Sequence, residues 1–224
     1  RRCYLDVMNK IIGSLMILFL GLPMIVNAHT IDYELVNLSS EDIVGQYLSL
    51  GFTHIIPLGL DHILFVISLF LLGNKLSNII WQATAFTVAH SITLGLAMYG
   101  YIKPLPEIIE PIIALSIFFV AIENIIVKEI KPSRIVIVFL FGLVHGMGFA
   151  NVLVDLGLPQ KDYFLGLFSF NLGVELGQLV IILISWLIIG KWFYQKTWYR
   201  QRIIVPVSCI IAIISLYWIY ERMI

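Results

Sequence analysis

Residues 52–72 read FTHIIPLGLDHILFVISLFLL, an apolar segment that contains few polar side chains, among them His54, Asp61 and His62. An α-helix of ~20 residues crosses the ~30 Å hydrocarbon core of a bilayer, so this segment has the length of a membrane span. An ionisable group at the centre of a span costs roughly 2.5–3.5 kcal/mol on insertion scales, which makes it a candidate functional residue. The segment therefore indicates a membrane protein, and its ionisable side chains are candidates for the functional site.

The composition of the whole chain agrees with a bilayer as its solvent. Of the 224 residues, 60% are hydrophobic and 12% are charged, whereas soluble domains are ~45–50% apolar. Lys plus Arg and Asp plus Glu both number 14, so no basic excess is available for nucleic-acid binding, which is excluded. The two cysteines, Cys3 and Cys209, form neither a CxxC site nor a disulfide framework. Any metal site must use histidine, carboxylate and amide ligands.

Residues 1–28 have the pattern of a cleavable signal peptide. Lys10 precedes an apolar run over 11–25, and small residues at 26–28 suit a signal peptidase. An uncleaved first helix is the alternative. Cleavage would make His29 the amino terminus, where its amine and imidazole form a candidate chelate for a divalent metal. A solvated terminal histidine is the plainer interpretation.

Residues 53–224 are predicted to form an all-α bundle of six transmembrane helices, preceded by a short acidic extracytoplasmic segment at 29–52. In that segment, Ser40-Glu41-Asp42 predicts the start of a surface helix. The predicted spans are 52–72, 79–99, 111–127, 135–153, 163–189 and 203–220. The loops after the first, third and fifth spans hold most basic residues, which by the positive-inside rule predicts both mature termini outside.

Polar side chains occur in the first five predicted spans. At ~1.5 Å of rise per residue they fall at similar depths, between the outer half and the middle of the bilayer, with His54 above the others. No intramembrane Lys or Arg is available to pair with the carboxylates Asp61, Glu123 and Glu175, so we expect a metal ion or an imidazolium as their counter-charge. The predicted metal ligands are His54, Asp61, His62, His90, Glu123, His145, Asn171 and Glu175, with His29 and Gln178 as candidate additions.

The predicted ligands suit a borderline divalent ion. Imidazole and carboxylate without thiolate favour nickel, cobalt, zinc or copper(II) over copper(I). Single residues also have plainer interpretations. His90 or Gln178 alone would often be a helix–helix hydrogen bond worth about 0.6 kcal/mol, and Ser91 would often bond to its own helix. Glycines beside these residues would let helices approach closely or loosen a helix locally.

Five ordered motifs resemble the HupE/UreJ family of bacterial membrane proteins. They are HIIPLGLDH at 54–62, FTVAHS at 86–91, Glu123-Asn124, HGMGFA at 145–150 and FNLGVELGQ at 170–178. The resemblance spans the signal peptide and all six predicted helices, and looks closest to the uncharacterised HupE/UreJ-like branch. It implies nickel or cobalt uptake for metalloenzyme maturation, with roles for His54, Asp61 and His62. It also implies the bacterial inner membrane as the location and metalloenzyme maturation proteins as partners.

Three functions remain open from the sequence. The first is a nickel or cobalt carrier. The chain has no GxxxxGK[ST] nucleotide-binding loop, so transport would be coupled to a gradient or uncoupled.

The second is an intramembrane zinc hydrolase, in which histidines and Asp61 hold the metal and Glu123 or Glu175 is the general base, assisted by Ser91. Against the hydrolase, the chain lacks a paired HxxxH. The third is a metalloenzyme assembly factor or metal sensor. A carrier needs an inward route, and the few titratable groups in the inner half of the spans favour a fixed site open to the outside.

Overall fold

The structure of the chain is a computed structural model that describes residues 40–73, 75–129, 131–155 and 162–224. Every regular element within these ranges is a helix, which confirms the predicted all-α class. The predicted signal peptide, His29 and the first part of the acidic segment lie outside the described residues.

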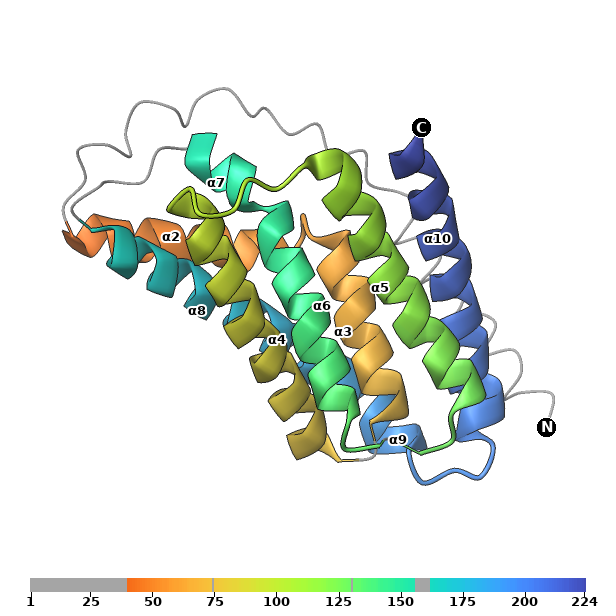
Figure 1. Cartoon of the computed structure of the whole chain (residues 1–224). Helices are drawn as coiled ribbons and strands as arrows, with labels where there is room; N and C mark the ends of the chain where they lie inside the picture. The colour runs from red at the N-terminus through yellow and green to blue at the C-terminus, as the bar shows by residue number, and fades with distance from the viewer. Residues whose placement is uncertain (1–39, 74, 130, 156–161) are drawn as a thin grey trace. The chain divides into compact units, whose positions relative to one another are not determined.

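Six helices run alternately up and down between two ends of a bundle (Figure 1). They are α3 (Leu60–Leu72), α4 (Leu76–Met98), α5 (Pro106–Ile126), α6 (Arg134–Gly148), α8 (Tyr163–Ser185) and α10 (Val205–Met223). We call the end where α3 begins and α10 finishes the upper end, as Figure 1 is drawn, and the opposite end the lower end.

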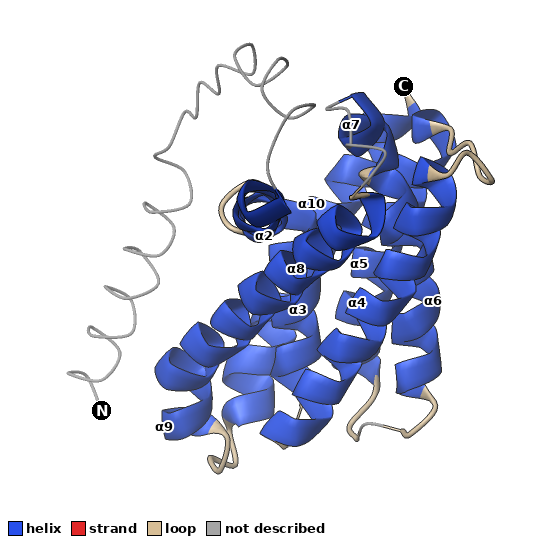
Figure 2. Ribbon diagram, turned by 90° about the vertical axis from the view of Figure 1, so that its left-hand side faces the viewer, coloured by secondary structure: helices blue, strands red, loops and turns tan. Residues whose placement is uncertain are grey.

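Shorter elements lie at the two ends of the bundle. At the upper end, α2 (Ser40–Ile55) lies across the bundle and packs against α8, which Figure 2 shows from the side. The short α7 (Ala150–Asp155) also lies there, after the helix breaks at Phe149 directly behind the HGMG sequence. At the lower end, α9 (Lys191–Phe193) stands between two π-helical turns, η2 (Trp186–Gly190) and η3 (Arg200–Ile204).

Within the described residues, four or five helical segments qualify as membrane spans, so the predicted count of six is not confirmed. Four helical segments are long and apolar enough to cross a bilayer, namely Leu76–Met98, Pro106–Ile126, Tyr163–Phe193 and Arg200–Met223. The predicted first span is a pair of helices, Asp42–Ile55 and Leu60–Leu72, bent by 68°. The break contains Pro57, which has no N–H for the helical ladder. This pair is either a broken span or a re-entrant loop, and α6, at 15 residues, is shorter than the ~20 that a span needs.

Glycines let two pairs of helices approach to backbone contact. At the crossing of α2 and α8, a Cβ on Gly173 would overlap the Leu48 carbonyl oxygen. Between α4 and α6, a Cβ on Gly146 would overlap the carbonyl oxygen of His90. Close approach at small residues is how helices pack where apolar surroundings give no hydrophobic drive. These glycines therefore hold α2, α4, α6 and α8 together near the upper end.

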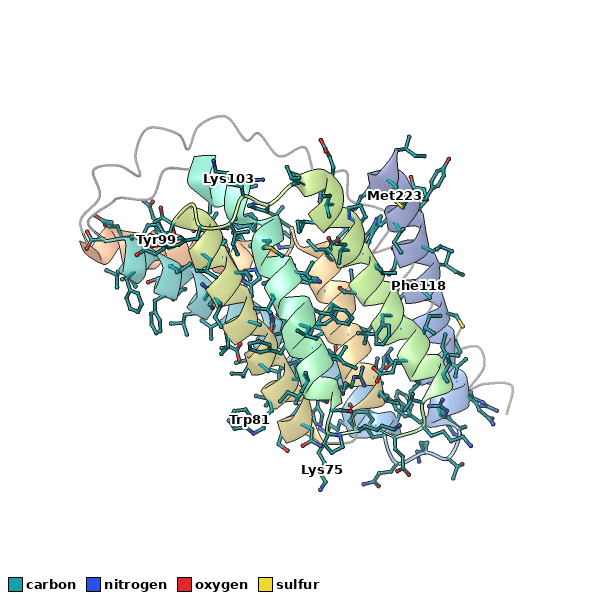
Figure 3. The ribbon with its side chains drawn as sticks, viewed as in Figure 1. Lys75, Trp81, Tyr99, Lys103, Phe118 and Met223 are labelled. Carbon is teal, nitrogen blue, oxygen red and sulfur yellow. The ribbon has the colours of Figure 1, made fainter. Side chains whose placement is uncertain are left out.

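Most basic residues of the described chain lie at one end of the bundle. Lys75 and Trp81 mark the lower end in Figure 3, while Tyr99, Lys103 and Met223 mark the upper end. The basic residues of the lower end are Lys75, Lys128, Lys131, Arg134, Lys191, Lys196, Arg200 and Arg202. This distribution is the one on which the predicted topology depends, and it places the predicted cytoplasmic loops together at one end.

We predict that added methyl groups at the close helix contacts destabilise the bundle. Gly146→Ala and Gly173→Ala should each lower the free energy of unfolding by about 1–3 kcal/mol, because a Cβ overlaps backbone that cannot move freely. Unfolding of the purified protein in mixed micelles measures the change.

Gly45→Ala is the matched control, because its Cβ would meet nothing within 4 Å. It should leave stability unchanged or slightly higher, as alanine is the better helix former. Equal stability of Gly146→Ala and Gly45→Ala would contradict the proposed role of the glycine contacts.

Candidate metal centre

Three histidines from three helices meet below the upper end of the bundle. His54 lies in the last turn of α2, His62 in the first turn of α3, and His90 in the upper half of α4. One ring nitrogen of each lies within 4.8 Å of those of the other two. His54 and His62 were both predicted to lie in one span over residues 52–72. Instead, the break between α2 and α3 turns the two rings toward each other, with centroids 4.7 Å apart.

The ring nitrogens of this histidine cluster, His54, His62 and His90, are available to a ligand. The Nε2 atom of each is buried and has no hydrogen-bond partner among the described residues. Leaving a buried polar atom unpaired costs about 1–3 kcal/mol. Because neutral imidazole is a ligand for nickel, zinc and copper, one divalent ion would satisfy all three atoms. The three histidines therefore fit a metal ion, because each has a buried nitrogen without a partner.

Asn171 on α8 determines which nitrogen of His90 carries the proton. The Asn171 side-chain amide donates to the carbonyl oxygen of Leu167 at 2.8 Å, so its Oδ1 faces the ring. That Oδ1 lies 3.2 Å from Nδ1 of His90 and can only accept. His90 therefore carries its proton on Nδ1 and keeps the lone pair on Nε2. Asn171 was predicted as a metal ligand. In the structure it accepts a hydrogen bond from the candidate ligand His90 and orients its ring, as the outer partners of metal-bound histidines commonly do.

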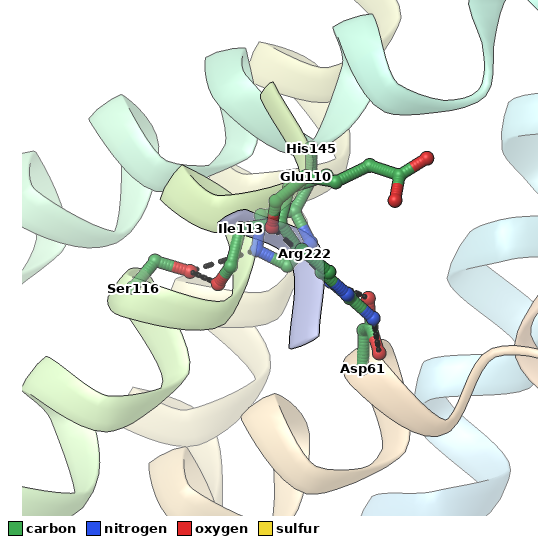
Figure 4. A network of polar contacts seen from close by, with 6 residues as sticks. All are labelled: Asp61, Glu110, Ile113, Ser116, His145 and Arg222. Carbon is green, nitrogen blue, oxygen red and sulfur yellow. Dashed lines mark hydrogen bonds and ion pairs between the residues drawn. The ribbon is translucent and has the colours of Figure 1, made fainter. Parts of the chain in front are cut away.

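His145 on α6 is a fourth histidine beside the cluster. Its ring centroid lies 5.0 Å from that of His62. Ser116 on α5 donates to the Ile113 carbonyl oxygen at 2.7 Å, so the Ser116 hydroxyl accepts from Nε2 of His145 at 2.9 Å (Figure 4). Nδ1 of His145 is buried and unpaired. His145 therefore has one fixed and one free nitrogen, as His90 has.

Phenylalanines enclose the four histidines. Phe149 lies 4.0 Å from His54 between ring centroids, and Phe86 lies 4.9 Å from His145. Phe65 and Phe170 also contact histidine rings of the group. An apolar enclosure restricts the ring orientations and limits access of water, which strengthens electrostatic interactions inside it. Sequence reasoning did not identify these phenylalanines, although Phe86, Phe149 and Phe170 belong to the motifs quoted above.

A pocket of about 520 Å³ leads from the upper end to the histidines. His54, His62 and His145 line its inner part, and Asp61, Glu110 and Arg222 are also in its lining. His90 is fully buried and is not part of the lining. The site is thus reached from the upper end, the end predicted to face outward.

Two of the predicted carboxylate ligands are paired with arginines. Arg222, near the end of α10, forms an ion pair with Asp61 at 3.0 Å (Figure 4). Arg134, the first residue of α6, forms one with Glu123 at 3.1 Å and also donates to Asn124. The expectation that no basic residue could reach these carboxylates was therefore wrong. Both arginines lie at helix ends, and a long side chain extends its charge well beyond its own backbone position.

The remaining predicted residues lie along a contact between α4 and α8, away from the pocket. Glu175 accepts a hydrogen bond from Thr84 at 2.7 Å, and its second carboxylate oxygen is buried and unpaired. Gln178 faces Thr87 at 3.4 Å. Ser91 donates to the carbonyl oxygen of its own helix, as one interpretation predicted. We call Thr84, Thr87, Glu175 and Gln178 the polar seam; it continues from Asn171 toward the lower end.

The structure thus divides the predicted ligands into three groups: four histidines with free nitrogens together with Asn171, which bonds to His90; two arginine-paired carboxylates; and Glu175 and Gln178 in the polar seam. Sequence reasoning missed Ser116, Arg134 and Arg222 as partners of these groups. The position of each arginine within one turn of a helix end was the available signal, because such residues can reach back toward a buried carboxylate.

Comparison with known proteins gives one match. A family model described as "HupE / UreJ protein" matches residues 30–222, nearly the whole chain. No curated protein and no solved structure matches significantly.

We predict that Glu123 and Arg134 stabilise the fold rather than bind metal. Arg134→Met should lower the free energy of unfolding by about 3–5 kcal/mol, because a carboxylate loses its partner in nonpolar surroundings. The double variant Glu123→Met/Arg134→Met should recover most of that loss, since no unpaired charge remains. Unfolding in mixed micelles tests both, and a double variant no more stable than Arg134→Met would contradict this assignment.

Proposed function

The chain belongs to the HupE/UreJ family, and from that premise we propose that it carries a divalent transition-metal ion across the bacterial inner membrane. Nickel or cobalt is the proposed cargo, with zinc as the third candidate. The observation that carries this proposal is the histidine cluster with its three buried, unpaired Nε2 atoms, of which His54 and His62 line an open pocket. The proposed orientation has the upper end outside and the basic lower end in the cytoplasm.

Recognition of the ion is proposed to take place at His54, His62 and His90. Histidine–metal bonds are about 2.0–2.1 Å long, so nitrogens within 4.8 Å of one another need to close inward only on the order of 1 Å. Three neutral imidazoles and no thiolate favour nickel, cobalt or zinc over copper(I). The hydrogen bond from His90 to Asn171 maintains the required tautomer before the ion arrives.

The metal ion is proposed to enter the pocket past its carboxylate side chains. Asp61 and Glu110 attract a cation from the upper end, while Arg222 holds Asp61 in an ion pair. A divalent ion that displaces the guanidinium gains Asp61 as a transient partner next to His62. The Asp61–Arg222 pair therefore acts as an exchangeable counter-charge, and the carboxylate is never left unpaired in apolar surroundings.

The inward route is proposed to follow the polar seam. Thr87 lies one helical turn below His90, and Thr84 lies one turn below Thr87. Gln178 and Glu175 face these residues from α8. The unpaired oxygen of Glu175 would be a second, weaker station for a cation after it leaves the histidines. The seam supplies oxygen ligands along the part of the bundle that the upper pocket does not reach.

A metal-dependent hydrolase is the second candidate, and one observation favours it. The upper pocket reaches three histidines, whereas a larger pocket at the lower end is lined by none of them. A site open at one end suits a zinc ion that keeps one position for water. The general bases expected from the sequence fit less well, because Glu123 pairs with Arg134 and Glu175 does not line the pocket. A sensor or assembly factor would share the same metal site.

We predict that purified protein binds one divalent ion per chain with micromolar or tighter affinity. His90→Ala should reduce bound metal to less than a tenth, because the cluster then offers only two imidazoles. Asn171→Leu should weaken binding about 10–100-fold, the usual effect of losing the partner of a ligating histidine. Equilibrium dialysis against Ni²⁺, Co²⁺ and Zn²⁺ with elemental analysis measures both.

Asn78→Leu, an exposed amide at the lower end of α4, is the matched control and should bind as the wild type does. Wild-type protein that retains no more metal than His90→Ala would contradict both the carrier and the hydrolase.

Transport itself is tested with Glu175→Gln in proteoliposomes. The variant should still bind metal at the histidines, while nickel uptake falls at least tenfold because the inner station is lost. Glu107→Gln, on the exposed first turn of α5, should take up nickel at the wild-type rate. If wild-type protein binds metal but shows no uptake of any of the three ions, the carrier is ruled out and a fixed site remains.

A further inference from the structure

The lower end of the bundle contains a second pocket that the histidine site does not use. Its volume is about 740 Å³, and it lies between the end of α3 and the segment that joins α8 to α10. Four basic side chains line it: Lys128, Lys191, Lys196 and Arg200. Among the described residues, its lining includes no aspartate or glutamate. The pocket is therefore electropositive, in a chain whose formal net charge is zero.

Basic residues at this end are expected from topology alone, yet their placement is selective. Lys75, Lys131 and Arg202 also lie at the lower end, but they do not line the pocket. Of the four cations that line the pocket, Lys191, Lys196 and Arg200 come from the segment that joins α8 to α10, and Lys128 follows α5. The fold therefore brings a lysine of a second connection to the same cavity.

The wall of the pocket is built without any ligand. Arg200 donates to the carbonyl oxygens of Val127 and Ile125 at 2.8 and 2.7 Å, where α5 ends. Tyr194 and Tyr199 donate to the carbonyl oxygens of Phe70 and Leu71, at the end of α3. These bonds satisfy terminal carbonyls of two helices and fix the segment that carries the basic side chains.

Two π-helical turns contribute to the lining. Trp186 and Gly190 belong to η2, and Arg200 and Ile204 belong to η3. π-helical turns account for well under 1% of residues in proteins, and they often occur at functional sites because they change where side chains point. Two of them at one pocket are a second feature, independent of charge, that is common at functional sites.

We propose that this pocket binds the phosphate group of an anionic lipid such as phosphatidylglycerol. The pocket lies where two long apolar segments meet the end of the bundle, Tyr163–Phe193 finishing and Arg200–Met223 starting, which is the level of lipid headgroups. Trp192, 61% exposed, stands in its rim, and tryptophan is enriched at that level of the bilayer. Lysines supply the charge, while Trp186 and Trp192 supply apolar surface for the glycerol and the first methylenes.

Native mass spectrometry of delipidated protein in detergent tests this proposal. Phosphatidylglycerol should bind saturably, with one lipid at least tenfold tighter than phosphatidylcholine. K191Q/K196Q should weaken this first site about 30-fold, which corresponds to about 1 kcal/mol for each lysine. Inorganic phosphate at millimolar concentration should not displace the lipid, because it lacks the apolar contacts.

K75Q/K131Q is the matched control, since it removes the same charge from exposed lysines of the same end that lie outside the pocket. It should change the affinity for phosphatidylglycerol less than threefold. Equal weakening in both double variants would show general surface attraction and overturn the proposed site. Equal affinity for phosphatidylcholine, or full displacement by inorganic phosphate, would overturn the assignment to an anionic lipid. The histidine site lies at the other end, so these outcomes are independent of metal binding.

Discussion

A polar atom buried among nonpolar side chains needs a partner, and this requirement explains how the bundle is arranged. Glu123 and Asp61 meet arginines that reach in from helix ends. Ser116 and Asn171 each accept a hydrogen bond from one ring nitrogen of a histidine. After these pairings, the buried atoms without a partner among the described residues include the Nε2 atoms of His54, His62 and His90. These unpaired atoms are an exception to the rule that buried polar groups are hydrogen-bonded, and they are the reason for proposing a metal site there.

Close backbone packing allows this arrangement to exist. Gly146 brings α6, which carries His145, against α4, which carries His90, and Gly173 brings α8, which carries Asn171, against α2, which carries His54. The break between α2 and α3 contributes equally, because it directs His54 toward His62 across a bend. At the opposite end, π-helical turns and tyrosine hydrogen bonds build a cationic pocket from the same chain. The two ends therefore differ in charge and in the ligand that we propose for each.

Much of the fold could be predicted from residue patterns. The apolar segments and the separation of basic residues predicted a helical membrane protein, and the motifs at 54–62 and 170–178 predicted its family, which the family match confirms. The number of spans was less certain, because apolar composition does not show whether Pro57 bends a span or ends it. Depth estimates along antiparallel helices placed His62 and His90 at one level, whereas His54, predicted to lie above them, belongs to the same cluster in the structure. Depth alone left Asp61 and Glu123 in the same group, since it takes no account of how far an arginine side chain reaches.

The sequence by itself determined the solvent, the helical class, the family and the residue types available for chemistry, because hydrophobicity and local motifs are properties of neighbouring residues. Only the tertiary structure decided which of those residues share a site. Arg222 and Asp61 stand 161 positions apart, and Asn171 and His90 stand 81 apart. Whether a carboxylate is paired or a nitrogen is free depends on what lies opposite it in space, and no local pattern contains that information.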